Sequence, residues 1–215
     1  MPESKVTQFV NALQKSVAQS YPTLAQNRDY TSVVNDRHYV RLQALVDDAI
    51  RLGARKVEIN PAGEQLAPES RKLAPTLLLD VDDEMQVMQE EIFGPVLPIV
   101  PYRTLDEALG YINDRPRPLA LYYFDFDADR AQRVLERTIS GGATINDTLM
   151  HFACDDLPFG GVGPSGIGAY HGKEGFQTFS HKKGVFTQAK LNMAASMGPP
   201  YAGKIDKLLG FLIGK

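Results

Sequence analysis

The chain has 215 residues, of which 43% are hydrophobic and 23% are charged, and its formal net charge is -3. These proportions are ordinary for a globular protein with a real core, and the charge gives no electrostatic basis for binding nucleic acid. The single cysteine excludes an internal disulfide framework and a cysteine-built zinc site, and it is typical of a reducing compartment.

The two ends and the histidines exclude further classes of protein. Residues Met1 to Lys5 form no apolar run of the signal-peptide type, and no stretch approaches the length of a membrane span. The histidines are scattered without the spacing of metal ligands, so no metal site is expected. They are His38, His151, His171 and His181. The composition therefore indicates a cytoplasmic, soluble protein of mixed α/β class.

The first half of the chain predicts two helices and then two short strands. Apolar residues at helical spacing predict a helix over Val6 to Ser20, which Tyr21-Pro22 ends. A second helix is expected from about Asp36 to Leu52, with Gly53 as its C-cap. The strands, which a polar loop separates, are expected at Lys56 to Ile59 and Thr76 to Val81.

From Val96 onward, expected strands and helices alternate. They are a strand from Val96 to Tyr102, a short helix opened by the capping-box-like Thr104 to Glu107, a strand from Leu119 to Phe124, a helix from Asp127 to Ile139 and a strand from Gly142 to Ile145. This alternation predicts a largely parallel open sheet with flanking helices. Ligands bind beyond the carboxyl ends of the strands in such sheets, so the segment after Ile145 is expected to contribute to a site.

Gly161 to Gly166 formally matches the G-x-G-x-x-G dinucleotide fingerprint. That fingerprint needs a strand directly before it, a helix that opens inside it and an acidic residue about twenty positions later. Here Asp155 to Pro158 precedes the glycines, Pro164 interrupts them, and Lys182 and Lys183 stand near the place expected for the acid. We therefore reject the dinucleotide-binding interpretation. The glycines indicate a backbone that bends sharply or approaches a neighbour closely.

Cys154 follows His151 by three residues, which raises the hypothesis of a thiol nucleophile. A usable base must reach the sulfur, and a short separation within a loop does not ensure that it does. Asp155 and Asp156 would also disfavour a thiolate beside them. We expect Cys154 to be a small loop or pocket-lining residue. The alternative is an unrelated thiol enzyme that uses it.

Glu90 and Glu91 lead into the apolar run that continues to Val96. Adjacent glutamates are ordinarily a solvated helix end. In an extended stretch, however, Glu91 and Phe93 would share one face. That face could offer a carboxylate to a ribose hydroxyl and an aromatic wall beside it. The residues alone leave both interpretations open.

Two motifs resemble those of the aldehyde dehydrogenase superfamily. Glu90 to Val96 resembles the family's E-x-F-G-P-V motif, and Leu157 to Gly168 resembles its P-F-G-G-x-x-x-S-G-x-G signature. The motifs occur in the family's order, and the resemblance runs along nearly the whole chain. The stretches Ile145 to Leu149 and Asp155 to Pro158 look most like the coniferyl aldehyde dehydrogenase branch.

This resemblance implies roles for four residues in a complete enzyme that oxidises an aromatic aldehyde to the acid. Glu91 would accept hydrogen bonds from the nicotinamide ribose hydroxyls of NAD or NADP. Phe93 would pack beside the cofactor near the nicotinamide. Phe152 and Phe159 would line the path of the aldehyde substrate.

The resemblance also implies that the chain is the C-terminal portion of such an enzyme. The family's nucleophilic cysteine, its water-activating glutamate and its glycine-rich cofactor turn match no residue here, and Cys154 is not at the nucleophile's position. We therefore expect the chain to begin inside the catalytic domain and to be inactive alone. It should expose apolar surface that would otherwise meet the missing part.

Three segments are expected on the same basis. Residues 1–180 would be the C-terminal part of the catalytic domain, and 181–188 a strand of the oligomerisation arm that pairs with another subunit of a homo-oligomer. Residues 189–215 would be a tail with an amphipathic helix, which we expect to dock on the core or a partner rather than on a membrane surface. The alternative function is a non-enzymatic module that pairs with full-length subunits through the arm.

Overall fold

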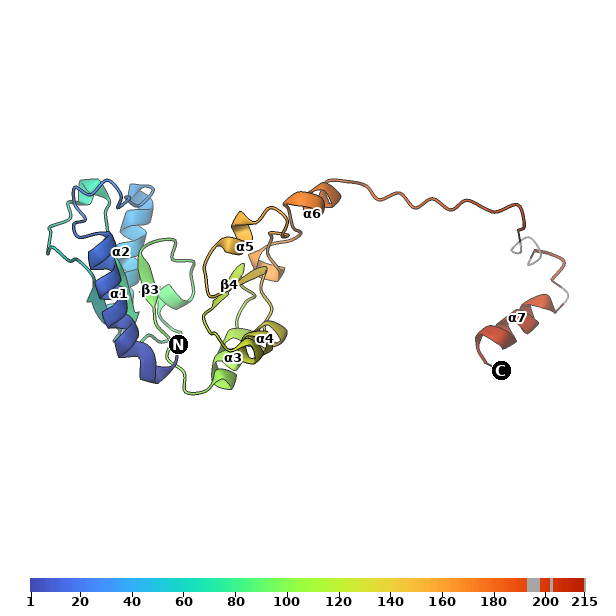
Figure 1. The fold of residues 1–215 in the computed structure, drawn as a ribbon, viewed down its shortest axis with the longest axis horizontal. Coiled ribbons are helices and arrows are strands. Elements are labelled where there is room, and N and C mark those ends of the chain that lie inside the picture. The colour runs from blue at the N-terminus through green and yellow to red at the C-terminus, as the bar shows by residue number, and fades with distance from the viewer. Residues whose placement is uncertain (193–197, 202, 215) are drawn as a thin grey trace.

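The computed structural model describes residues 1–192, 198–201 and 203–214. Figure 1 shows two lobes side by side, then an extended segment and a last helix. The α-helices are α1 (Val6–Ser20), α2 (Asp36–Arg51), α3 (Leu105–Asn113), α4 (Ala128–Arg137), α5 (Met150–Ala153), α6 (Gly172–Thr178) and α7 (Lys204–Leu212). The strands are β1 (Arg55–Glu58), β2 (Thr76–Leu79), β3 (Val96–Pro98), β4 (Ala120–Tyr123) and β5 (Gly142–Ile145). Short 3-10 helices are η1 (Glu3–Lys5), η2 (Pro68–Ser70), η3 (Gln86–Met88) and η4 (Gly163–Ser165).

The α/β class and the expected strands are confirmed, but the strands form two sheets rather than one. The first lobe holds the order β1-β2-β3, and the second pairs β4 with β5 in parallel. Strand β2 is parallel to β3 and antiparallel to β1. Between β1 and β2 the chain forms the 3-10 turn η2 rather than a helical crossover. The two strands can therefore pair antiparallel. Strand β4 follows β3 by way of α3 and belongs to the second sheet.

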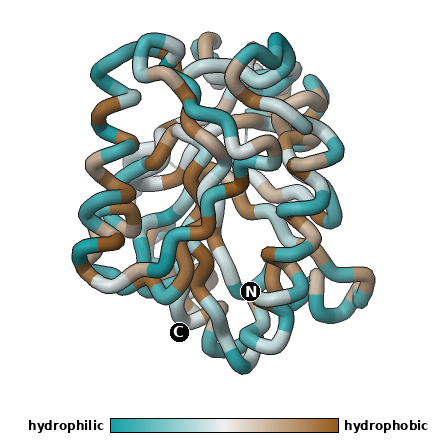
Figure 2. Tube along the Cα trace, turned by 90° about the vertical axis from the view of Figure 1, so that its left-hand side faces the viewer, coloured by the Kyte–Doolittle hydropathy of each residue, from teal (hydrophilic) through white to brown (hydrophobic). Residues whose placement is uncertain are grey.

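Two helices cover opposite faces of the first sheet. Leu78 belongs to the apolar cluster that α2 completes with Leu42 and Leu45, whereas Leu77 and Leu79 belong to the cluster on the side of α1. Alternate residues of a strand point to opposite faces, so one leucine run fills both interfaces. Figure 2 shows the apolar trace along the interior strands and the polar trace along the outer loops.

Three helices begin at side chains that accept a hydrogen bond from the first turn, and the sequence pattern predicts the one at Thr104. The pairs are Asn35 with the His38 N–H (2.9 Å), Thr104 with the Glu107 N–H (3.2 Å) and Asp127 with the Arg130 N–H (2.9 Å). The capping-box pattern at Thr104 is modified. The Glu107 carboxylate accepts from the N–H of Arg103 at 2.9 Å instead of from the cap residue itself.

The segment after α6 is extended and exposed. Residues 181–189 form no hydrogen-bonded strand within the described chain, although Val185 and Phe186 are exposed there. The expected tail helix is present as α7, and Figure 1 shows it apart from both lobes. Docking of α7 on the core is therefore not seen among the described residues, and residues 193–197, 202 and 215 of the expected tail lie outside them. No described helix combines the length and apolar character needed to cross a membrane.

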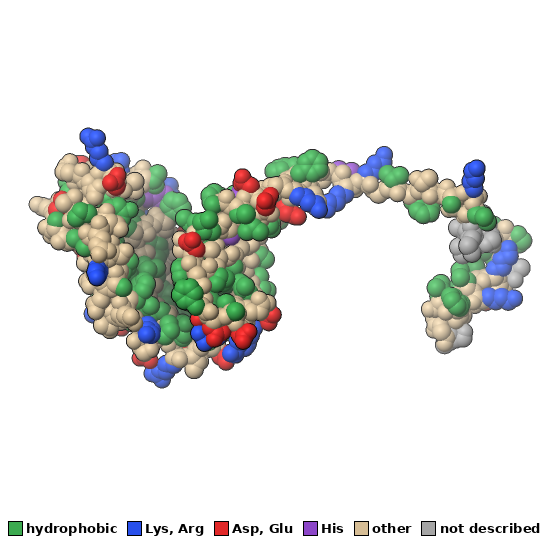
Figure 3. All heavy atoms as spheres, viewed as in Figure 1, with side chains coloured by type: hydrophobic (Ala, Val, Ile, Leu, Met, Phe, Trp, Pro, Cys, Tyr) green, Lys and Arg blue, Asp and Glu red, His purple; other side chains and the backbone are tan. Residues whose placement is uncertain are grey.

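Apolar side chains lie open on the second lobe, as expected for a chain whose surface meets further protein. Figure 3 shows them gathered on the walls between the lobes and over the outer part of the second lobe. Phe124, Ile139, Ile167 and Phe176 are more than half exposed. Exposed apolar area of this kind is typical of an interaction surface.

The loop after β1 is fastened to the segment after α1 by one carboxylate. Glu64 accepts hydrogen bonds from the N–H groups of Leu24 and Ala25, the latter at 3.1 Å. These backbone bonds, and the nearby Lys72, hold the pKa of Glu64 below its ordinary value of 4.5. Leu24 is fully buried, so its N–H group has no water to replace this carboxylate.

Truncating Leu42 should destabilise the protein, because its side chain fills the interface of α2 with the sheet and is fully buried. We expect Leu42→Ala to lower the free energy of unfolding by about 2–5 kcal/mol. Val40 lies on the same helix and is 62% exposed, so Val40→Ala should cost less than about 1 kcal/mol. Urea unfolding followed by circular dichroism measures both. Equal losses would contradict this packing.

The stability supplied by Glu64 should depend on pH. Because the folded state lowers the pKa of this carboxyl, its contribution is complete above the ordinary value of 4.5 and is lost as pH falls through the folded value. The difference in free energy of unfolding between the parent and Glu64→Gln should therefore shrink as pH is lowered from 6 to 3 in urea titrations. Glu69→Gln, at an exposed position of the same loop, is the control. A difference that is constant with pH would rule out this role.

Candidate functional site

Six rings from three segments of the second lobe form one aromatic cluster. They belong to Tyr122, His151, Phe152, Phe159, Tyr170 and His171. Phe152 meets Phe159 edge-on with 5.0 Å between ring centroids, and Phe159 meets Tyr170 in the same manner at 5.4 Å. The structure thus brings together the two residues that the sequence predicts to line the substrate path. Edge-to-face contacts of this kind stabilise a fixed arrangement of rings.

His151 anchors the short helix α5 against β5. Its Nδ1 lies 2.9 Å from the Thr144 hydroxyl, which also accepts a hydrogen bond from the His151 backbone N–H at 3.3 Å. The side chain is buried, and its Nε2 has no hydrogen-bond partner among the described residues. A Cβ atom at Gly142 would stand 2.5 Å from the imidazole, so only glycine leaves room for the ring. Phe152 follows directly, and this anchor therefore sets its position.

The glycine-rich signature folds back on itself. Phe159 and Tyr170 exchange two backbone hydrogen bonds of 2.9 Å. A Cβ atom would stand 2.0 Å from the Gly168 carbonyl if placed at Gly160, and 2.1 Å from the Ser165 carbonyl if placed at Gly161. The glycines thus serve close backbone packing. No strand precedes them and no α-helix opens inside them, which agrees with the rejection of the dinucleotide fingerprint.

Cys154 is exposed and follows the last residue of α5. Its backbone N–H donates to the carbonyl of Met150 at 3.2 Å. His151 turns inward to Thr144, and no hydrogen bond among the described residues joins its imidazole to the thiol. The geometry does not form the thiol–imidazole pair that a cysteine nucleophile uses.

The loop that carries Glu91 and Phe93 precedes β3. The Arg41 guanidinium of α2 donates to the backbone carbonyls of Glu91 at 3.1 Å and Ile92 at 2.6 Å. Gly94 packs so closely on Leu42 that a Cβ atom there would stand 2.5 Å from its side chain. The loop is therefore fastened to α2 from both sides of Phe93.

Phe93 does not lie in an extended stretch. Its φ is +51°, in the left-handed region, and its side chain is 72% exposed. The conditional expectation that Glu91 and Phe93 share one face of an extended strand is therefore wrong in its geometry, because the turn at Phe93 breaks the alternation. An aromatic residue held in this conformation is strained, and such strain is concentrated at functional sites.

The candidate groups lie at different ends of the strands, since Phe152 follows the carboxyl end of β5. Glu91 and Phe93 stand just before β3, and Gly160 packs against Gly141 at the start of β5. The chain after Ile145 turns back along β5 to reach Thr144, and it contributes His151 and Phe152 to the aromatic cluster. No hydrogen bond or ring contact among the described residues joins the Glu91 loop to the aromatic cluster.

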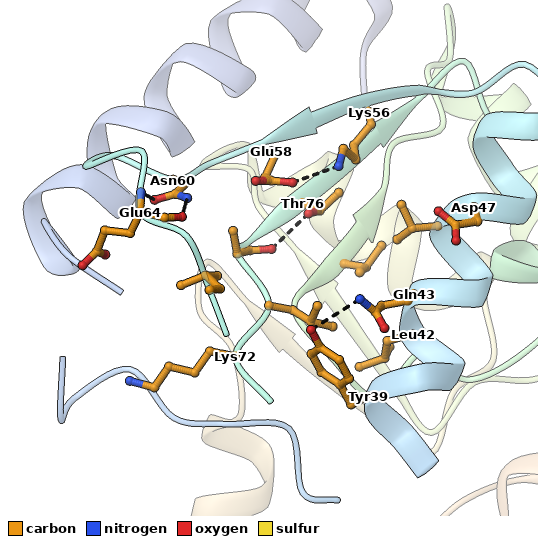
Figure 4. Close-up of a pocket in the computed structure, with 15 residues that line it drawn as sticks. Tyr39, Leu42, Gln43, Asp47, Lys56, Glu58, Asn60, Glu64, Lys72 and Thr76 are labelled. Atoms are coloured by element: carbon orange, nitrogen blue, oxygen red, sulfur yellow. Dashed lines mark hydrogen bonds and ion pairs between the residues drawn. The ribbon is translucent and has the colours of Figure 1, made fainter. Parts of the chain in front are cut away.

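A separate pocket of about 430 Å³ lies between α2 and the first sheet (Figure 4). Its charged and polar lining is largely paired within the chain: Lys56 bonds Glu58 at 2.8 Å, the Thr76 hydroxyl donates to Ala74, and Glu64 holds backbone N–H groups. None of the predicted site residues lines it. We attribute this hollow to local packing rather than to the site.

Sequence reasoning missed Arg41, His151 and Tyr170. The contact of Arg41 with Glu91 spans 50 positions and has no local signal. The sequence indicates His151 only as one of the scattered histidines and as a possible base for Cys154, although Thr144 seven residues earlier offers a partner. Among the residues described, no three His, Cys, Asp or Glu side chains form a group able to hold a metal ion.

Comparisons with known proteins match this geometry to one family. The aldehyde dehydrogenase family matches residues 1–185. The chain is 54% identical to a probable coniferyl aldehyde dehydrogenase of Caulobacter vibrioides, over 100% of this chain and 45% of that protein. It is 48% identical to a coniferyl aldehyde dehydrogenase of Pseudomonas sp., over 99% of this chain and 45% of that protein.

Solved structures of aldehyde dehydrogenases also match the chain. A substrate-bound AldH of Staphylococcus aureus matches with a TM-score of 0.81 and 42% identity, over 98% of this chain and 45% of that one. A Mycobacterium tuberculosis aldehyde dehydrogenase complexed with NAD+ matches with a TM-score of 0.75 and 28% identity, over 89% of this chain and 39% of that one. The chain thus spans less than half the length of these relatives. It belongs to the aldehyde dehydrogenase family.

Proposed function

We propose that this chain is the C-terminal portion of an enzyme that oxidises an aromatic, coniferyl-like aldehyde to the acid with NAD or NADP. The observation that carries the proposal is the 54% identity over the whole chain to a probable coniferyl aldehyde dehydrogenase. Contact between Phe152 and Phe159 supports an aromatic substrate, because ring faces and edges favour a planar aromatic ligand.

Glu91 and Phe93 would hold the cofactor. The Glu91 side chain is exposed and bonds no other described residue, so its oxygens are free to accept hydrogen bonds from ribose hydroxyls. Arg41 fastens the backbone of Glu91 and leaves the carboxylate available. Phe93 offers an exposed ring on the same loop. When bound, NAD or NADP supplies the hydride acceptor of the oxidation.

The chemical step needs groups that we cannot match to this chain. A cysteine thiolate would attack the aldehyde carbon, and a glutamate would later activate water against the thioester. Cys154 is exposed on a loop without a bonded imidazole, which fits no such role. The 215 residues alone are therefore proposed to be inactive.

The second candidate is a non-enzymatic module that pairs with full-length subunits of a cytoplasmic homo-oligomer. The extended segment 181–188 favours it, because Val185 and Phe186 are exposed and its backbone has no neighbouring strand among the described residues. Such an edge can pair with a strand of another subunit. Co-purification of a full-length subunit with this chain separates the two candidates.

The purified chain should not reduce NAD+ or NADP+ when given coniferaldehyde or a short aliphatic aldehyde. Absorbance of the reduced nicotinamide at 340 nm measures this directly. Turnover that disappears in Cys154→Ala would contradict the proposal and would identify a nucleophile within these residues. Turnover that persists in Cys154→Ala would also contradict the expected inactivity, and it would show that the reaction does not use Cys154.

A chimera tests the cofactor site. In it, the 215 residues replace the aligned part of the Caulobacter vibrioides relative. We expect Glu91→Ala to raise the KM for the cofactor about 10- to 100-fold, since hydrogen bonds to a charged group contribute about 1.5–3 kcal/mol. Glu90→Ala is the matched control and should change KM less than about threefold, because Glu90 only forms a 3.4 Å exposed ion pair with Arg41. Equal effects would refute the assignment of Glu91.

A further inference from the structure

Two histidines of the aromatic cluster contact Phe159, and they differ in their hydrogen bonds. His151 is buried, and its Nδ1 lies 2.9 Å from the Thr144 hydroxyl. His171 is half-buried, and its imidazole forms no hydrogen bond or ion pair within the part of the chain that the structure describes. Its Nδ1 is buried without a partner, so Nε2 is the nitrogen that remains open to a ligand. A polar group left in this state among apolar rings calls for a partner from outside the described residues.

The His171 ring contacts both residues that are predicted to line the substrate path. Its centroid lies 5.9 Å from that of Phe152 and 5.9 Å from that of Phe159, on which it stacks with 24° between the ring planes. Tyr170 also meets Phe159, but it lines a separate hollow of about 320 Å³ to which neither Phe152 nor His171 contributes. Among the rings of the cluster, His171 is therefore the polar one that contacts both phenylalanines.

The backbone fixes the place where the imidazole enters the cluster. The φ of His171 is +81°, and a side chain in this region carries strain of the kind that is concentrated at functional sites. His171 directly precedes α6, yet its side chain accepts no capping hydrogen bond from that helix. Gly172 packs so closely on the loop after α5 that a Cβ atom there would stand 2.8 Å from the Asp155 carbonyl oxygen. The position of His171 is thus set by its neighbours, and its nitrogens serve none of them.

We propose that His171 determines specificity by binding the ring hydroxyl of a phenolic aldehyde. The aromatic ring of the substrate lies against Phe152 and Phe159, and its hydroxyl group bonds Nε2 of His171. A hydroxyl both donates and accepts, so it suits either tautomer of a neutral imidazole. The inference rests on the proposed function, because it names the class of aromatic aldehyde that this site selects. That class is the hydroxylated cinnamaldehydes, of which coniferaldehyde is one.

The discrimination that one such bond gives is moderate. A site that pairs a substrate hydroxyl rejects an analogue that lacks it, because the polar group of the site is then left without a partner. His171 is half-buried, so water can replace part of the lost bond. We therefore expect the bond to favour the hydroxylated aldehyde about tenfold.

The chimera with the Caulobacter vibrioides relative tests the proposal with two substrates. They are coniferaldehyde and 3-methoxycinnamaldehyde, which differ only in the ring hydroxyl. His171→Phe keeps an aromatic ring and removes the nitrogens, so the ratio of the two kcat/KM values should fall about tenfold. The loss should lie in the value for coniferaldehyde. A ratio within one variant cancels losses from folding or from a displaced loop, because these affect both substrates.

Two further variants separate the hydrogen bond from the packing of the ring. His171→Gln retains a donor and an acceptor and should keep the ratio within about threefold of the parent chimera. Tyr170→Phe removes a hydroxyl from the adjacent ring and should change the ratio less than about twofold, because Tyr170 lines the other hollow. Calorimetric titration with the two corresponding acids, ferulic acid and 3-methoxycinnamic acid, gives the same comparison as a ratio of dissociation constants without turnover.

An unchanged ratio in His171→Phe would overturn the inference and leave the proposed oxidation intact. Equal losses for both aldehydes would assign His171 to support of the loop, which also overturns it. A tenfold fall in Tyr170→Phe would move recognition of the hydroxyl to that residue, with the same consequence. If the parent chimera oxidises neither aldehyde, the proposed function fails, and the titration with the two acids then decides whether His171 binds the hydroxyl.

Discussion

Strand β2 is buried from both sides, and the first lobe is arranged around it. Leu77 and Leu79 pack toward α1 while Leu78 packs toward α2, so neither helix can move without opening a cavity beside a leucine. Strand β3 pairs with β2, so its position is fixed by the packing of β2 between the two helices. The Glu91 loop leads into β3, and Arg41 of α2 bonds its carbonyls. The position of the proposed cofactor loop therefore follows from the packing of α2.

A different constraint organises the second lobe. The absence of a side chain at Gly142 admits the His151 ring, which lets α5 lie along β5 instead of continuing away from it. Phe152 and Phe159 then meet in one aromatic cluster. In this lobe, close backbone packing and contacts between rings stabilise the arrangement, as buried leucines do in the first lobe. The lobe has few fully buried residues of its own, and Val134 is one of them.

Local signals in the sequence were sufficient for the elements and insufficient for their assembly. The caps at Asn35, Thr104 and Asp127 act within four residues, so the helix starts could be predicted. Which strands pair depends on residues outside each strand. No local pattern in the sequence therefore indicates that the strands divide into two sheets. At the site, the Glu91 to Val96 motif could be recognised, but the left-handed turn at Phe93 was not predictable, because aromatic residues rarely adopt it.

That turn has an evolutionary consequence. A left-handed conformation costs a non-glycine residue about 1–2 kcal/mol, and glycine at position 93 would avoid this cost. Selection for stability alone would thus drive Phe93 toward glycine, so retention of the ring requires an opposing advantage that only a side chain can give. Sequences in which position 93 contacts no ligand would be free to make this exchange. Position 93 is therefore a place where loss of function could leave a mark while the fold persists.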